Sequence, residues 1–328
     1  MPAAPDVIAS YRARYGDALV DAQLDALHRH GDTIDDPDVW LGAALAGDFK
    51  FMAVERVAAC CCGSADSEAL VRFIFWNLLG LRRCRSCGTL FVSPRLSPEA
   101  MRRVFDTSYF DHADIERWGH RREPIFDDAI RILRGIGARS VFDVGTAYGH
   151  FVAAALAAGL DAEGCDVSPS AIRRGRAELG VRLREGTVAS LEPPLPVVDC
   201  VTSFDALYYT ADPVQELRGM RRLLRAGGYL LLRLRNAEHA RVAPAREIGR
   251  SALPVEHLWG FTPRSIARPL ERAGFQIVSR WAAPYSRTRL SGLQQLWWRM
   301  GQVSARVRPH APLLTQSFTI VARALPDP

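Results

Sequence analysis

Between about residue 125 and residue 325, hydrophobic and polar positions form two patterns that alternate along the chain. Short apolar runs bounded by Gly, Pro or Asp are typical of buried strands, and apolar positions three or four residues apart are typical of helices. The pattern predicts strands at 140–144, 162–166, 181–184, 199–204, 228–234, 275–281 and 317–323, and helices at 149–159, 169–179, 213–225 and 263–273. Strands that alternate with helices of about ten residues form βαβ units, so the sequence predicts an α/β fold with a mostly parallel sheet.

Two further regions precede this part of the chain. Apolar residues at helical spacing run through "DVIASYRARYGDALVDAQLDALHRHG" and stop at Gly31, so residues 1–54 are expected to be helical. Residues 55–100 contain five of the seven cysteines and are expected to form a small separate module. Residues 101–328 would then be the α/β domain, with an insertion at about 284–315 between its last two strands. Such insertions often cover an acceptor pocket, although a dimer contact or ordinary helix packing would explain this one equally well.

Composition narrows the class of protein. The 328 residues are 48% apolar and 24% charged, as in soluble globular proteins, and the longest apolar run is far shorter than the roughly 20 residues that cross a bilayer. The N-terminus lacks the basic flank of a secretory signal, so a cytoplasmic location is expected. The net charge of +6 comes from arginine, because Lys50 is the only lysine. These arginines are spread along the chain, which favours a solvated basic surface over a nucleic-acid partner.

One glycine-containing turn indicates a ligand. The stretch "VFDVGTAYGHF" at 141–151 runs from the first predicted strand into the first helix, and this turn cradles the ligand of open α/β sheets. Asp143 and Asp166 end consecutive strands, 23 residues apart, in the pattern of a carboxylate that accepts from ribose hydroxyls. The spacing D-x-G-x-A-x-G lacks the middle glycine of dinucleotide-binding turns, and Asp143 suits a positive group such as the ammonium of S-adenosylmethionine. Ala147 is expected to replace glycine without cost unless its φ is positive.

Residues 125–325 resemble a class I S-adenosylmethionine-dependent methyltransferase. Five motifs carry the resemblance in the order of that family: "VFDVGTAYGHF", "AEGCDVSPSAI", "VDCVTSFDALYYTADP", "LLRAGGYLLLRLRN" and "PVEHLWGFTPRSIARPLERAGF". The resemblance implies a Rossmann-like sheet of seven strands, mostly parallel with the last strand antiparallel. It also implies an enzyme that takes its methyl group from S-adenosylmethionine and releases S-adenosylhomocysteine.

The same resemblance implies where the cofactor would lie. The methionine portion would face the turn after the first strand, formed by Asp143, Gly145, Ala147, Tyr148, Gly149, His150 and Phe151. The ribose would face Asp166 and Val167 after the second strand, and the adenine would face Thr187 and Val188 after the third. The sulfonium would lie near Phe204 and Asp205 at the end of the fourth strand.

The cysteines of the N-terminal half have the spacing of a metal site. Cys84 and Cys87 in "CRSCG" are placed so that two thiolates reach one tetrahedral ion. The partner pair would come from "ACCCG", with 21 residues between Cys62 and Cys84. A structural zinc ion held by Cys62, Cys84, Cys87 and either Cys60 or Cys61 is expected, although no cysteine precedes Cys62 by three residues. A metal-free remnant of such a site and a redox pair are the alternatives. The two remaining cysteines lie in predicted strands and are expected to be core residues.

The next segment extends the resemblance toward the N-terminus. "RCRSCGTLFVSPRLSPEAMRRVFDTSYF" is similar to the segment that joins a zinc-ribbon-like module to the methyltransferase domain in a group of bacterial enzymes. That group includes sugar C-methyltransferases and other methyltransferases of specialised metabolism. The similarity implies that Tyr109 folds over the cofactor, although packing of an inter-domain helix explains this residue equally well.

Glu256 and His257 are the candidate pair for acid–base chemistry. Methyl transfer from a sulfonium depends mainly on positioning, and a base is needed only when the acceptor must lose a proton. Tyr208 and Tyr209 occupy the slot where many relatives carry Glu-His. Glu256 and His257 in "PVEHLWGF" resemble the Glu-His segment of sugar C-methyltransferases, which predicts His257 as the base, Glu256 as its partner and the tyrosines as acceptor contacts. The alternative is a purely structural segment leading into a helix capped by Thr262.

The sequence therefore predicts a methyltransferase with a small-molecule acceptor in bacterial specialised or sugar metabolism, acting as a monomer or homodimer. The alternative is an RNA methyltransferase whose Arg82, Arg83 and Arg85 grip the phosphate backbone. The slot "SFDALYY" lacks the polar-proline-aromatic motif of RNA base methyltransferases, which argues against methylation of a base but not of a ribose. A non-catalytic scaffold is a third reading, but it would need a broken cofactor site, and both Asp143 and Asp166 are present.

Overall fold

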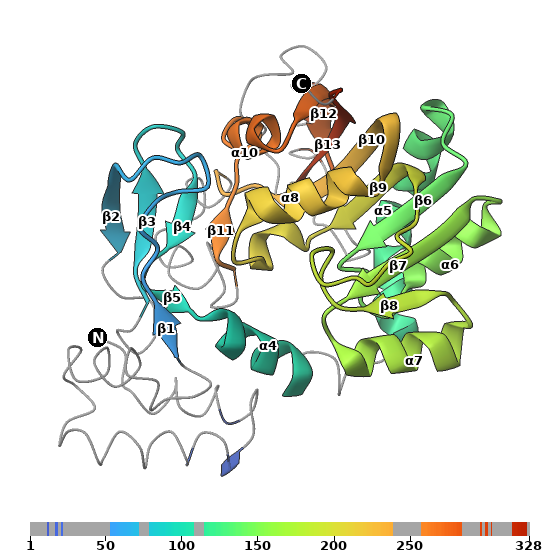
Figure 1. The fold of residues 1–328 in the computed structure, drawn as a ribbon, viewed down its shortest axis with the longest axis horizontal. Coiled ribbons are helices and arrows are strands. Elements are labelled where there is room, and N and C mark those ends of the chain that lie inside the picture. The colour runs from blue at the N-terminus through green and yellow to red at the C-terminus, as the bar shows by residue number, and fades with distance from the viewer. Residues whose placement is uncertain are drawn as a thin grey trace.

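A seven-stranded sheet with helices packed against it forms the larger part of the fold, and two small sheets lie beside it (Figure 1). The computed structural model describes residues 53–71, 79–107, 115–238, 257–283 and 317–326, with single positions between 12 and 21 and between 296 and 303. The expected helical region 1–54 and the insertion at 284–315 therefore lie almost entirely outside the described residues. Within the described ranges, no helix combines the length and the apolar character needed to span a membrane.

The strands of the large sheet confirm the predicted fold class. They are β6 (Ser140–Val144), β7 (Asp161–Asp166), β8 (Leu183–Glu185), β9 (Val198–Phe204), β10 (Leu224–Arg235), β12 (Phe275–Ala282) and β13 (Ser317–Ala324). Their order is β12-β13-β10-β9-β6-β7-β8. β13 runs antiparallel to both of its neighbours, whereas the other pairings are parallel. This is the Rossmann-like arrangement that the resemblance implied, and β6 and β9 meet where the strand order reverses.

Several of the helices begin at capping residues and prolines that the sequence places in their first turns. They are α4 (Pro98–Thr107), α5 (Ile115–Gly135), α6 (His150–Ala157), α7 (Pro169–Leu179), α8 (Pro213–Arg222), α10 (Ala267–Arg272) and the short 3-10 helix η1 (Leu207–Tyr209). Ser168 and Asp212 cap α7 and α8 with their side chains, and a proline opens each helix. α10 begins four residues later than predicted, because Thr262 and Ser265 bond each other's backbone N–H groups and hold a turn before the helix.

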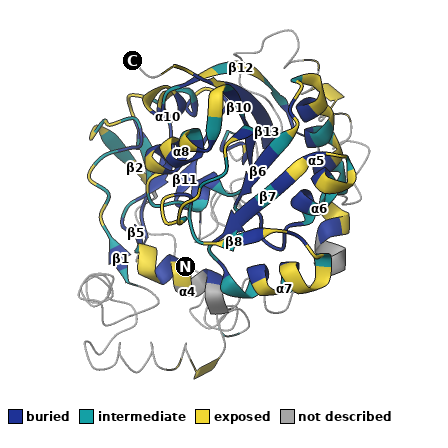
Figure 2. Cartoon of the chain, turned by 45° about the vertical axis from the view of Figure 1, so that its right-hand side comes forward, coloured by how far each residue is buried: buried dark blue, intermediate teal, exposed yellow. Residues whose placement is uncertain are grey.

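Two hydrophobic cores lie on opposite faces of the sheet, since successive side chains of a strand point to opposite faces. Leu230, Leu232 and Leu234 of β10 belong to the core that includes residues of α8 and α10. Leu231, between them in sequence, belongs to the core that includes residues of α5 and α6. Figure 2 shows the consequence, with buried strands at the centre and exposed positions on the outer faces of the helices.

The small sheets connect the cysteine-rich segment to the α/β part of the chain. One pairs β1 (Val54–Glu55) with β5 (Arg95–Leu96). The other has the order β11-β4-β3-β2, formed by β2 (Ser67–Val71), β3 (Leu81–Cys84), β4 (Leu90–Val92) and β11 (Trp259–Gly260). β11 comes from the "EHLWGF" segment, far along the chain, so a strand of the methyltransferase-like region completes the sheet of the cysteine-rich segment.

Candidate active site

A cavity of about 860 Å³ opens at the carboxyl ends of the central strands. Its wall includes residues that end or follow β6, β7, β9 and β10, and residues of α4 and α5. Ligands of open α/β sheets bind outside the carboxyl ends of the strands where the strand order reverses. The cavity lies at that point, between β6 and β9.

The turn between β6 and α6 is tightly constrained. Gly145 has a φ of 76°, and a Cβ at this position would lie 2.3 Å from the Cβ of Ala206. Ala147 has a φ of 53°, so it holds a left-handed conformation that favours glycine. The expected tolerance of alanine depended on a negative φ, and the positive value means that the turn carries strain of about 1 kcal/mol. Asp166 contributes to holding this conformation, because its Oδ2 accepts the Ala147 N–H at 2.8 Å.

Two buried carboxyl groups lie on adjacent strands in the wall of the cavity. Asp143 of β6 accepts a hydrogen bond of 2.7 Å from the Thr202 hydroxyl, and burial raises its pKa to about 7. Asp166 of β7 accepts from the backbone N–H groups of Ala147 and Ser168, and burial raises its pKa as well. Backbone donors therefore fix the Asp166 carboxyl group in place at the end of its strand.

Most of the residues that the resemblance placed near the cofactor line this cavity: Asp143, Gly145, Ala147, Phe151, Asp166, Val167, Thr187, Phe204 and Asp205. Four others lie next to the wall without lining it: Tyr148, Gly149, His150 and Val188. Tyr148 is fully buried, with its ring edge-on to His150 and the guanidinium of Arg174 over its face. α6 begins at His150, and Phe151 in its first turn lines the cavity again. Tyr109 lies outside the described residues.

His257 and two tyrosines form an aromatic cluster in the wall. The His257 Nε2 lies 3.2 Å from the Tyr209 hydroxyl, and its ring centroid is 4.3 Å from that of Tyr208. His257 is only 4% exposed, yet it lines the cavity together with both tyrosines. Phe105 of α4 packs edge-on against Tyr209 at 5.2 Å between centroids. The predicted partner Glu256 lies outside the described residues. Among the described residues, the Tyr209 hydroxyl lies within hydrogen-bonding distance of His257.

A partly buried ionic cluster at the end of β9 and β10 was not anticipated from the sequence. Asp205 Oδ2 accepts from Arg122 of α5 at 3.0 Å and also from Arg233 of β10. Asp205 has a φ of 59°, another left-handed residue that is not glycine. The signal was present in "LLLRLRN", where arginines alternate with leucines in a strand that is otherwise apolar. Arg122 had no comparable signal, since it lies among other charged residues of α5.

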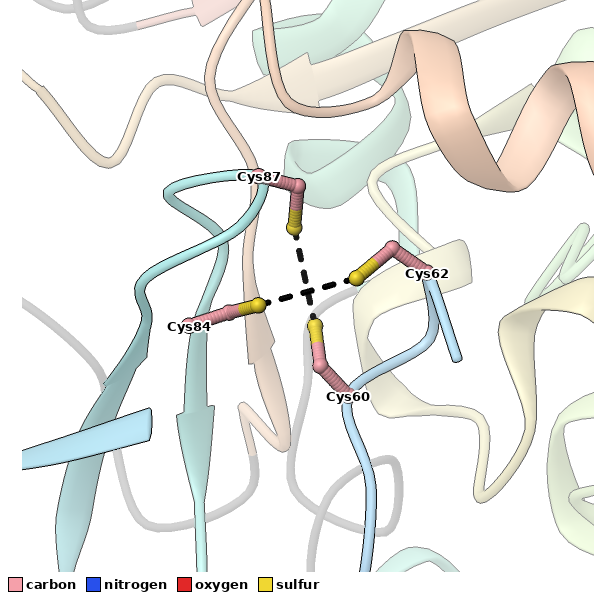
Figure 3. Close-up of side chains that lie close together, drawn as sticks. All are labelled: Cys60, Cys62, Cys84 and Cys87. Carbon is pink, nitrogen blue, oxygen red and sulfur yellow. Dashed lines mark hydrogen bonds between the residues drawn. The ribbon is translucent and has the colours of Figure 1, made fainter. Parts of the chain in front are cut away.

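Four cysteines converge outside the cavity (Figure 3). The sulfur atoms of Cys60, Cys62, Cys84 and Cys87 all lie within 4.8 Å of one another. Two of the separations are 3.7 Å, from Cys60 to Cys87, and 3.6 Å, from Cys62 to Cys84. Thiolates about 2.3 Å from one tetrahedral zinc ion are about 3.8 Å apart, so the donor set fits zinc in both chemistry and spacing.

Two tight turns bring the cysteines together, although Cys60 and Cys62 are two residues apart and Cys84 and Cys87 are three. Gly63 donates to Cys60 and Gly88 donates to Cys84, so each pair of cysteines is held on a hydrogen-bonded turn closed by a glycine. Between Cys60 and Cys61, which the sequence left as alternatives, the structure places Cys60 in the cluster. Cys165 and Cys200 are buried in β7 and β9, as expected for core residues.

Comparison with known proteins gives the family. Residues 111–280, more than half of the chain, match the family model described as a methyltransferase domain, whereas no curated protein matches the sequence. A methyltransferase from Clostridium acetobutylicum ATCC 824 that depends on S-adenosylmethionine is similar over 65% of this chain and 100% of its own, at 10% identity and a TM-score of 0.45. Magnesium protoporphyrin IX methyltransferase (ChlM) from Synechocystis PCC 6803, solved with S-adenosylhomocysteine, is similar over 66% of this chain and 90% of its own, at 16% identity and a TM-score of 0.44. The CcbJ methyltransferase from Streptomyces caelestis is similar over 63% of this chain and 90% of its own, at 16% identity and a TM-score of 0.43. From the family match and the order of its strands, the chain belongs to the methyltransferase domain family, as the resemblance to class I S-adenosylmethionine-dependent methyltransferases implied.

Proposed function

We propose that this methyltransferase transfers a methyl group from S-adenosylmethionine to a small-molecule acceptor of bacterial specialised or sugar metabolism. The observation that carries the proposal is the buried Asp166 carboxyl group, fixed by two backbone N–H groups at the end of β7 and facing a cavity of about 860 Å³. A cavity of this size takes a nucleoside and a second small molecule. None of the seven cysteines forms a disulfide, which agrees with the reducing cytoplasm that we propose as its location.

The residues of the cavity fit S-adenosylmethionine, which when bound supplies an activated methyl group on a sulfonium. Asp166 accepts from the ribose hydroxyls, and Thr187 flanks the adenine. Asp143, on the next strand, faces the ammonium of the methionine portion, and the left-handed turn at Gly145 and Ala147 brings the backbone close to it. Phe204 closes β9 beside the position of the sulfonium. These assignments follow the motif order of the family together with the position of each residue in the cavity wall.

His257 takes the acceptor proton in this proposal. Its Nε2 contacts the Tyr209 hydroxyl, so the tyrosine holds the ring and faces the acceptor with Tyr208. The acceptor oxygen, nitrogen or acidic carbon would take its methyl group from the sulfonium of bound S-adenosylmethionine. The acceptor proton passes to the imidazole, which makes it a general base.

The cysteine cluster holds a structural zinc ion in this proposal. Cys60, Cys62, Cys84 and Cys87 supply four thiolates, which closes the coordination shell and leaves no position for a substrate. The cluster lies outside the wall of the cavity, in agreement with a structural role.

The basic segment of the cysteine module gives the RNA alternative little support. Arg83 pairs with Glu68, and Arg85 lies near both Asp66 and Glu68. Arg82 donates to the side chain and the carbonyl of Ser67. These arginines are therefore directed toward their own sheet, and the neighbouring acids offset the charge that a phosphate backbone would need.

Calorimetry with S-adenosylhomocysteine tests the cofactor site. Asp166→Ala is expected to lose at least tenfold in affinity, about 1.4 kcal/mol, because the ribose hydroxyls lose their acceptor. Asp161→Ala is the matched control, since Asp161 opens the same strand at the exposed end. Equal affinity of the Asp166→Ala and Asp161→Ala proteins would overturn the assignment.

A further inference from the structure

Glu216 places a carboxyl group in the wall of the cavity that the proposed function does not use. The residue belongs to α8, and only 9% of its surface is exposed. Within the part of the chain that the structure describes, no basic side chain pairs with it, and the group that favours its charged form is the Val188 backbone N–H. A carboxyl group with so little access to water requires a hydrogen-bond donor.

Two observations place this carboxyl group beyond the carboxyl ends of β7 and β8. Val188, whose N–H interacts with it, comes shortly after β8. Cys165 lies next to the end of β7, and the pKa of its thiol is raised first by burial and then by the charge of Glu216, which acts more strongly than that of Asp166. The Glu216 carboxyl group therefore lies close to the strand ends where the ribose and the adenine are proposed to bind.

α8 packs closely against the segment that follows β8. A Cβ at Gly219 would lie only 3.0 Å from Val188 Cγ1, so the helix approaches this segment at a position without a side chain. Glu216 comes three residues before Gly219 and therefore lies on the same face of the helix. Met220, one turn after Glu216, is fully buried and also lines the cavity. This face of α8 thus carries a carboxyl group and an apolar side chain to the place proposed for the adenine.

Thr187, which flanks the adenine in the proposed function, has its polar groups paired within its own turn. Its N–H donates to Ser190 Oγ at 2.9 Å, and its hydroxyl lies 3.2 Å from the same oxygen. Its carbonyl accepts from the Ser190 N–H at 3.0 Å. Recognition of the polar edge of the base therefore falls to a group outside this turn.

We propose that Glu216 recognises the adenine of S-adenosylmethionine by accepting a hydrogen bond from its exocyclic amino group. Adenine carries this donor at C6, whereas hypoxanthine carries a carbonyl oxygen there, so a carboxylate favours the first base and repels the second. Glu216 is thus a specificity-determining residue of the cofactor site. The inference rests on the proposed function, because it takes the segment after β8 as the place of the adenine.

Calorimetry with two cofactor analogues tests this proposal. S-adenosylhomocysteine and S-inosylhomocysteine, which has a carbonyl in place of the amino group, are titrated into the full-length protein. The unaltered protein should bind S-adenosylhomocysteine about tenfold or more tightly than S-inosylhomocysteine. Glu216→Gln should remove this preference, because the Val188 N–H holds the amide oxygen and the amide NH₂ then faces the base, where it suits the carbonyl of hypoxanthine. Glu271→Gln is the matched control, since it removes the same charge from an exposed position of α10 and should keep the preference.

The outcomes separate this inference from the proposed function. Equal affinity of the unaltered protein for the two analogues, or a preference that survives in Glu216→Gln, overturns the role of Glu216. If Glu216→Gln does not fold, S-adenosylhomocysteine dimethylated on the amino nitrogen takes its place in the test. This analogue lacks the donor, so it should bind the unaltered protein weakly, and binding as tight as that of S-adenosylhomocysteine overturns the inference. If the unaltered protein does not bind S-adenosylhomocysteine, the proposed function itself fails.

Discussion

The backbone N–H of Leu258 donates to the carbonyl of Tyr208 at 2.9 Å, while the carbonyl of Leu258 accepts from Val92 at 3.1 Å. One residue thus joins the loop after β9 to a strand of the cysteine-bearing sheet. The indole of Trp259 adds a second link, since its Nε1 donates to the Thr210 carbonyl at 2.8 Å. The position of His257, directly before Leu258, therefore depends on both the large sheet and the cysteine module.

Zinc content is the first prediction. The full-length protein is expected to contain one zinc ion per chain, and Cys62→Ser should remove it because a tetrahedral site loses one of its four thiolates. Cys62→Ser should also lower the midpoint of thermal unfolding, since the metal stabilises the folded state to which it binds. Elemental analysis and thermal unfolding measure the two effects.

Cys61→Ser is the control for this experiment. Cys61 lies next to two of the proposed ligands but is not part of the four-sulfur cluster, and its own contact with the α/β part of the chain is made by its carbonyl, which accepts from Arg272. Cys61→Ser should retain the zinc. Loss of zinc in both variants, or well under one zinc ion in the unaltered protein, would contradict the assignment.

The second prediction is a pH dependence that arises from Asp143. Burial raises its pKa from 3.8 to about 7, so its contribution to stability is complete below about pH 4 and is lost as the pH rises through 7. Asp143→Asn removes this loss, because the amide oxygen still accepts from Thr202 and carries no charge. The variant should therefore be more stable than the unaltered protein at pH 8, with a smaller difference at pH 5.

The same carboxyl group should make cofactor affinity depend on pH. An ionised Asp143 attracts the ammonium of S-adenosylmethionine, so the affinity of the unaltered protein should rise between pH 6 and pH 8. Asp143→Asn should bind more weakly at pH 8 and show a flatter profile. Parallel profiles for the two proteins, measured by calorimetry across this range, would exclude Asp143 as the titrating group.

Much of the α/β fold could be predicted, because each strand and helix is specified by a local pattern. The strand at 140–144 and the helix at 169–179 have the predicted bounds, since the helix has a serine cap, a proline in its first turn and a glycine after its end. β11 could not be predicted. Its two residues have no periodicity, and it forms only because Trp259 and Gly260 find the edge of β4 in the folded chain.

The residues of the site that belong to a recognisable sequence motif could be predicted. The ion pairs between residues far apart in the sequence could not. Asp143 and Asp166 follow strands that the hydrophobic pattern reveals, so their meeting in one cavity follows from the parallel sheet. The contact of Arg122 with Asp205 joins residues 83 positions apart, on elements whose packing the sequence does not specify. The strain at Ala147 was likewise hidden, because it depends on the hydrogen bond from its N–H to Asp166.

The third prediction concerns this strained turn. Ala147→Gly should raise the free energy of unfolding by about 1 kcal/mol, because glycine adopts the observed φ of 53° without a clash of its side chain. The hydrogen bond to Asp166 uses the backbone N–H and survives the change, so affinity for S-adenosylhomocysteine should stay the same. Ala154→Gly, within α6, should instead destabilise the protein by about 1 kcal/mol. Urea unfolding measures both, and a destabilised Ala147→Gly protein would show that the left-handed turn is not a source of strain.

The last prediction tests His257 as the base. Once a screen for S-adenosylhomocysteine release has identified an acceptor, His257→Ala should reduce turnover by roughly 10²- to 10⁴-fold and leave cofactor binding nearly intact. Tyr209→Phe removes the hydroxyl that contacts Nε2 while keeping the aromatic packing against Phe105, so it should cost less than loss of the imidazole. A structural role for His257 makes a different prediction, because Leu258 and Trp259 would then shift with it. In that case turnover would fall only in step with the amount of folded protein, and the acceptor would be a nucleophile that needs no base, such as a free amine.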